Sequence, residues 1–166
     1  MRIVDSILAE LDRETETTRR VLERVPDEKL TWKPHTRSMS LGQLAQHVAT
    51  IPGGVANIVS RSEFVVPEFN NFPSAEKASE LVPALGRSVA DAKAILSDLD
   101  DAAMLATWKL TRDGNEILSL PRAAVVRSIM LNHWYHHRGQ LSVYLRLLDV
   151  TLPSIYGPSA DENPFA

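Results

Sequence analysis

Four stretches of the chain repeat apolar residues every three or four positions, and this helical period is the strongest constraint on the fold. Each stretch has one apolar stripe and polar residues on its other faces. Helices of this kind can bury their stripes together only as a bundle. The sequence therefore predicts an all-α fold, a four-helix bundle with helices near 3–25, 41–58, 78–99 and 121–148, followed by an irregular C-terminal tail.

Two features of the second predicted helix concern its start and its continuity. Ser40 followed by Gln43 is the pattern of a capping box, which predicts that a helix begins there. Pro52 lies within the same helix and has no N–H for the carbonyl of Val48. The sequence predicts either a kink or an early stop at this proline, and both alternatives stay open.

The connections between the helices carry weaker signals. Residues 62–74 contain three of the four phenylalanines and two prolines, and we expect an irregular loop there rather than a strand. Residues 107–118 contain Asp113-Gly114, a tight-turn signal, which predicts a small hairpin-like excursion.

Length and composition narrow the class of protein. A chain of 166 residues is expected to form a single domain, residues 1–166. It has no cysteine, so any metal must be held by nitrogen and oxygen. With a net charge of −3 and no basic cluster, we expect no binding to nucleic acid. No apolar run is long enough for a membrane span and no signal sequence is evident, so we expect a cytoplasmic protein.

Three of the five histidines lie on the apolar stripes of two predicted helices. His133 and His137 are four residues apart, so their imidazoles lie one above the other on one helix face. His47 shares a face with the aliphatic residues of the second predicted helix. A buried imidazole is unfavourable when its polar nitrogens have no partner. One cation bound by three imidazoles would supply a partner to each of them. The sequence therefore predicts a metal site of His47, His133 and His137, although a lone buried histidine such as His47 is more often an ordinary core residue.

The remaining histidines and the residue after His133 exclude other interpretations. His136 is rotated away from His137, so we expect it at the surface or beside the site, and His35 lies in a polar connection. A zinc protease of the HExxH type would need glutamate directly after the first histidine, where this chain has Trp134. The sequence therefore excludes that class of protease.

The chain resembles the DinB/YfiT-like superfamily of metal-binding four-helix bundles. The resemblance rests on three segments: Ser40-Leu41-Gly42-Gln43-Leu44-Ala45-Gln46-His47, the run from His133 to Arg146 that contains His-His-Arg-Gly-Gln-Leu, and the tail from Val150 to Glu162 with Tyr-Gly-Pro-Ser-Ala-Asp. It implies an up-down-down-up bundle, often a homodimer, with a divalent ion such as Ni, Zn, Mn or Fe on His47, His133 and His137. Relatives include thiol-dependent S-transferases and proteins described as hydrolases.

These observations lead to two main functional hypotheses, beside the third that the three histidines hold no metal under physiological conditions. The first is a metal-dependent enzyme that activates water or a low-molecular-weight thiol toward a small-molecule substrate. The second is a non-catalytic metal-binding bundle with a role in stress response or in protein interaction. The sequence identifies no catalytic residue, because Arg138, Tyr144, Asp161 and Glu162 all have ordinary structural interpretations as ion-pair or packing residues.

Overall fold

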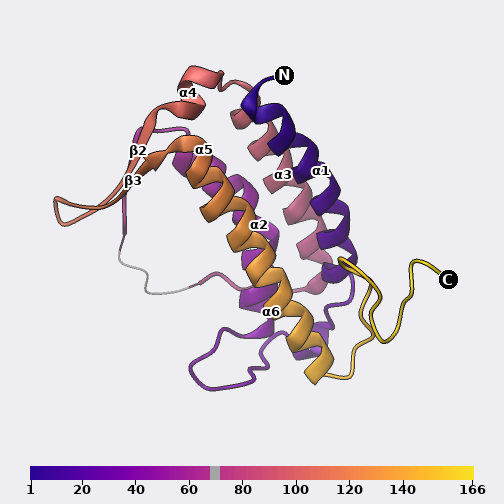
Figure 1. The fold of residues 1–166 in the computed structure, drawn as a ribbon. Helices are drawn as coiled ribbons and strands as arrows, with labels where there is room; N and C mark the ends of the chain where they lie inside the picture. Colours follow the sequence, from indigo (N-terminus) through magenta and orange to yellow (C-terminus); the bar gives the residue numbers. More distant parts are fainter. Residues whose placement is uncertain (68–71) are drawn as a thin grey trace.

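The computed structural model describes residues 1–67 and 72–166 of the chain. Within these ranges the structure is mostly helical, with a small sheet at one end (Figure 1). The elements in chain order are α1 Ile3–Leu22, η1 Asp27–Lys29, α2 Leu41–Val59, β1 Glu63–Val65, η2 Ala78–Glu80, α3 Leu81–Ser97, α4 Asp101–Leu105, β2 Thr107–Arg112, β3 Asn115–Pro121, α5 Arg122–Val125, η3 Val126–Asn132 and α6 His133–Leu147.

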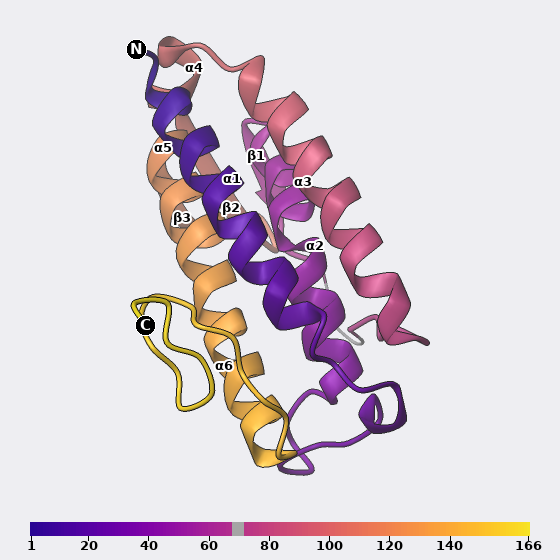
Figure 2. The same ribbon diagram turned by 90° about the vertical axis from the view of Figure 1, so that its right-hand side faces the viewer.

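The long helices lie side by side around one apolar core. Figures 1 and 2 show α1 and α6 running in one direction, whereas α2 and α3 run in the other. α5, the π-helix η3 and α6 follow one another without a break and form the last long helical segment. The core contains fully buried aliphatic residues from every long helix, together with Trp108 and Trp134.

α2 begins as the sequence predicts. The hydroxyl of Ser40 accepts from the backbone N–H of Gln43, and the side chain of Gln43 accepts from the backbone N–H of Ser40. α2 does not stop at Pro52 but continues to Val59, so the prediction of an early stop is wrong.

The expectation of an all-α protein is wrong in one respect, because the described residues include a three-stranded sheet of order β1-β2-β3. β2 and β3 form the predicted hairpin around Asp113-Gly114, both with positive φ, the conformation of a tight two-residue turn. β1 pairs in parallel with β2, Phe64 opposite Leu110. The irregular loop expected at 62–74 thus contains a short strand, and its residues 68–71 lie outside the described part of the chain.

The C-terminal tail has no helix or strand, as expected, and it folds back beside α1 and α6 (Figure 2). Arg20 of α1 forms an ion pair with Glu162, and Arg24 donates to the hydroxyl of Thr151. None of the helices in the described ranges combines the length and the apolar character that crossing a bilayer requires.

Candidate metal centre

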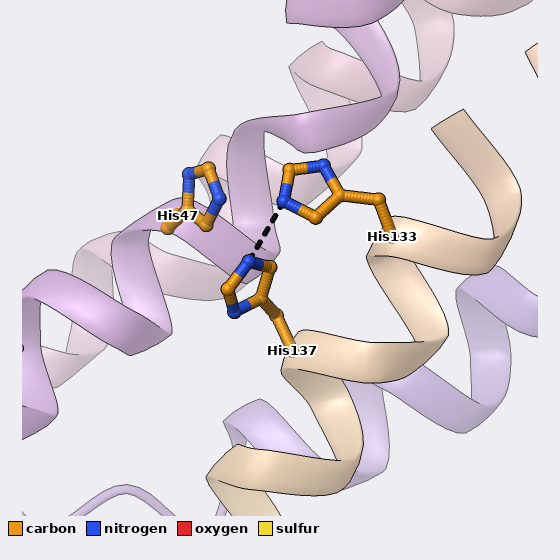
Figure 3. Close-up of side chains that lie close together, drawn as sticks. All are labelled: His47, His133 and His137. Carbon is orange, nitrogen blue, oxygen red and sulfur yellow. Dashed lines mark hydrogen bonds between the residues drawn. The ribbon is translucent and has the colours of Figure 1, made fainter. Parts of the chain in front are cut away.

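The structure brings His47, His133 and His137 together between α2 and α6 (Figure 3). One nitrogen from each ring lies within 4.8 Å of the corresponding nitrogens of the other two. The ring centroids are 4.5 Å apart for His133 and His137 and 4.6 Å apart for His47 and His137. All three side chains are half-buried, so the cluster lies at the edge of the core.

A hydrogen bond joins α2 and α6 through the residues that directly follow His47 and His133. The indole N–H of Trp134, beside His133, donates to the carbonyl of Val48, beside His47, over 2.8 Å. That carbonyl is available because Pro52, one helical turn later, has no N–H to donate. The bond therefore joins the two helices next to the histidines that they contribute.

Ring nitrogens of His133 and His137 face each other inside the cluster. Nδ1 of His137 lies 2.8 Å from the amide oxygen of Gln140, and it donates to this oxygen in the tautomer that carries the proton on Nδ1. Nε2 of neutral His137 is then unprotonated, and it lies 2.7 Å from Nε2 of His133. The two Nε2 atoms are close enough to share a proton in a hydrogen bond or, when both are unprotonated, to bind one cation (Figure 3).

All three imidazoles are held in the neutral, metal-binding form. Burial, with a smaller contribution from the nearby rings of His137 and His133, lowers the pKa of His47 to about 4. Burial is also the main cause of the lowered pKa values of His133 and His137, and the acceptor Gln140 opposes it at His137. Near neutral pH these rings carry no positive charge that would repel a metal ion.

The donor set fits a divalent transition metal. Nitrogen ligands about 2.0–2.1 Å from a tetrahedral ion lie roughly 3.3 Å from one another, a value between the 2.7 Å and 4.8 Å found here. The contact between His137 and Gln140 is of the kind that orients a metal-binding imidazole. Small shifts of the three side chains would therefore suffice to hold an ion.

A largely apolar cavity of about 410 Å³ begins at His47 and His133. Its walls come from α2, from β1 and β2 of the sheet, and from the π-helix. The described residues that line it are His47, Thr50, Ile51, Gly54, Val55, Ile58, Phe64, Val66, Trp108, Leu110, Ile129 and His133. The histidine cluster thus opens onto a space that can hold an organic molecule.

The structure also locates the other histidines that the sequence analysis considered. His136 is exposed, and its ring centroid lies 5.0 Å from that of His137, so it stands beside the cluster, as expected. His35 is exposed in the connection before α2, where its Nδ1 accepts from the backbone N–H of Arg37.

Arg138 and Tyr144 have structural roles. Arg138 is 1% exposed and faces α1, where it pairs with Glu14 at 2.6 Å. Tyr144 packs edge-on against Trp32, and its hydroxyl donates to the carbonyl of Met39.

Asp161 and Glu162 also have structural roles. Asp161 accepts hydrogen bonds from Arg146 and from the backbone N–H of Leu152, and Glu162 pairs with Arg20. These contacts hold the end of the tail at the ends of α1 and α6. Neither carboxylate belongs to the histidine cluster.

Two groups of residues near the site did not emerge from the sequence analysis. Gln140 lies three residues after His137 on the same helix, and this spacing indicates that the two side chains can contact each other. The cavity walls at Phe64, Trp108 and Leu110 depend on how the sheet packs against α2, for which the sequence has no local signal.

The chain matches the DinB family over residues 1–164. It is 26% identical over 163 residues to the uncharacterized protein YrdA of Bacillus subtilis, covering 96% of this chain and 91% of that protein.

Solved structures that share the fold include two DinB-like proteins. A DinB-like protein of Bacillus cereus matches with a TM-score of 0.68 and 21% identity, covering 92% of this chain and 97% of the other. The DinB-like protein YjoA of Bacillus subtilis matches with a TM-score of 0.69 and 22% identity, covering 90% and 97%. With the family match over nearly the whole sequence, these findings show that the chain belongs to the DinB family.

Proposed function

We propose that this protein binds one divalent transition metal ion, such as Ni, Zn, Mn or Fe, through His47, His133 and His137. The observation that carries the proposal is the convergence of three neutral imidazoles from α2 and α6 on one point. In this interpretation the long helices form a four-helix bundle of the up-down-down-up type, and the sheet is an addition at one end.

We further propose that the metal centre is catalytic, and that the reaction is hydrolysis or the transfer of a low-molecular-weight thiol. A divalent ion with an open coordination position lowers the pKa of a water or thiol and makes it a nucleophile near neutral pH. The chain's own contribution is to orient His137 through Gln140, to keep the imidazoles neutral by burial, and to hold the substrate in the adjoining cavity.

One observation favours the alternative of a metal-binding protein without catalysis. The metal-ligating cluster found among the described residues consists of histidines alone, with no carboxylate to act as a general base. An ion at this place would tie α2 to α6 and stabilise the fold. The discriminating measurement is therefore activity in addition to metal content.

A cytoplasmic homodimer is part of the same proposal. Val143 and Leu147 are more than half exposed, and their spacing places both on one face of α6, where a second copy would cover them. Light scattering of the wild type and of a Val143→Glu, Leu147→Glu double variant tests this, with a monomeric wild type as the contrary result.

Metal content tests the first step. Protein purified without a nickel column is analysed by mass spectrometry, and we expect one ion per chain in the wild type and none in His47→Ala or His137→Ala. His136→Ala is the matched control, because it removes an exposed imidazole next to the cluster. At a free metal concentration 100 times the Kd, binding adds about 2.7 kcal/mol of stability, which raises the Tm by about 5–10 °C.

The opposite results are equally clear. If the wild type holds no stoichiometric metal and titrated ions leave its Tm unchanged, the metal site does not exist. If metal binds but neither esters and amides nor electrophiles with a panel of thiols are turned over, the non-catalytic alternative replaces the enzyme.

A further inference from the structure

The cavity beside the histidines has the composition of a binding site for one class of molecule. Apart from the two histidines at its end, its described lining residues are aliphatic or aromatic, with Gly54 and the single hydroxyl of Thr50. That hydroxyl already donates to the carbonyl of Gln46 over 2.9 Å. A charged or strongly polar group in this space would lose its water without gaining a partner from these residues.

We infer that the cavity takes an uncharged apolar group, an alkyl chain or an aromatic ring, of a substrate whose polar head lies at the histidine cluster. The inference rests on the proposed function for the role of the head and adds to it the chemical class of the substrate. The volume of about 410 Å³ lies within the range of small-molecule sites, about 300–1,000 Å³.

The apolar walls come from α2, the π-helix and the sheet, and they reach the histidine cluster at His47 and His133. Ile51, Val55 and Ile58 come from the same face of α2 as His47, and Ile129 lies one turn before His133. The opposite wall comes from the sheet, where Phe64 of β1 pairs with Leu110 of β2. A molecule bound by its head at the histidines therefore has its remaining atoms between the helices and the sheet.

Gly54 offers a way to fill the cavity without disturbing its neighbours. It lines the cavity from α2, and a Cβ atom added there would meet no other atom within 4 Å. The variant Gly54→Leu therefore adds its Cβ without a clash and carries a branched side chain at the cavity wall, while Gly54→Ala adds one methyl group and serves as the matched control. Phe64→Ala tests the opposite wall by removing its aromatic ring.

The experiment measures the Kd of 1-alkylimidazoles, from methyl to hexyl, by calorimetry with metal-loaded and metal-free protein. Each methylene that enters the cavity is expected to strengthen binding about fourfold. This gradient should persist in Gly54→Ala, flatten in Gly54→Leu and become shallower in Phe64→Ala. The Kd of the methyl compound with the loaded protein serves as each variant's own reference for this gradient.

Failure of the inference and failure of the proposed function give different results. If the loaded wild type binds all chain lengths equally, or if the gradient is unchanged in both Gly54→Leu and Phe64→Ala, the cavity does not hold the alkyl group. If the protein takes up no metal but still shows the gradient, the metal function fails and the apolar site stands.

Discussion

Replacing Trp134 with Phe tests how α2 continues through its internal proline. Within α2 the carbonyl of Val48 receives no hydrogen bond from position 52, because proline has no N–H. The indole N–H of Trp134 donates to this carbonyl instead. Trp134 is fully buried, so the Val48 carbonyl that it bonds is shielded from bulk water. Trp134→Phe should therefore leave a buried carbonyl without a partner.

Two terms make up the expected loss of stability. An unsatisfied buried carbonyl costs about 1–3 kcal/mol. The smaller ring also loses apolar burial and leaves a cavity, which adds roughly 1–2 kcal/mol. The free energy of unfolding should fall by about 2–5 kcal/mol in total, of which only the first term depends on the proline.

A double-mutant cycle with Pro52→Ala separates the two terms. Alanine at this position restores the N–H that can donate to the Val48 carbonyl within the helix. In that background Trp134→Phe should cost about 1–3 kcal/mol less than in the wild type, because only the cavity term remains. Urea unfolding followed by circular dichroism gives all four free energies. An equal cost of Trp134→Phe in both backgrounds would refute the explanation that the indole replaces the missing N–H.

Three further predictions concern α1, α2 and α6. Arg138→Met breaks a buried ion pair and should lower the free energy of unfolding, measured by urea titration, by about 3–5 kcal/mol. The control Arg146→Met breaks an exposed pair on the same helix and should cost less than about 1 kcal/mol. Gly53→Ala should destabilise the fold by about 1–3 kcal/mol, because its Cβ would lie 2.8 Å from a backbone oxygen of α3. Gly54→Ala, whose Cβ meets no atom, should stabilise the fold by up to about 1 kcal/mol. Equal Tm values of the two variants would contradict this contrast. The pKa of His47 is about 4 in the folded protein and near 6.5 when unfolded, so the unfolded state binds more protons between these values. The stability of the metal-free protein should therefore be complete above pH 6.5 and fall as the pH drops toward 4, by roughly 1–2 kcal/mol after allowance for partial exposure, and His47→Gln should reduce this slope.

Local patterns predicted the local features of this fold. The capping box at Ser40 and the turn at Asp113-Gly114 each depend on residues within a few positions of one another, and both formed as expected. Helical spacing also placed His133 and His137 on one face. By contrast, β1 has three residues and pairs with a strand more than 40 positions later, so no local period could reveal it.

The prediction that the histidines of α6 lie on its core stripe was inaccurate for an identifiable reason. The buried stripe of α6 consists of Trp134, Arg138, Leu141 and Leu145, and His133 and His137 lie beside it, half-buried. In the sequence alone, Arg138 is a charged residue and therefore interrupts the apolar stripe of Trp134, Leu141 and Leu145. Its burial depends on partners from α1 and the tail that the sequence of α6 does not contain.

The neighbours of the two α6 histidines explain why these rings can face α2 without help from the metal. Trp134, next to His133, is bonded to the Val48 carbonyl of α2. Arg138, next to His137, is bonded to Glu14 of α1 and to the hydroxyl of Tyr156 in the tail. A rotation of α6 that carried the histidines away from His47 would have to break contacts with two different helices. The protein backbone and its buried anchors thus set the geometry of the site, and the imidazole nitrogens that face one another are left for a ligand.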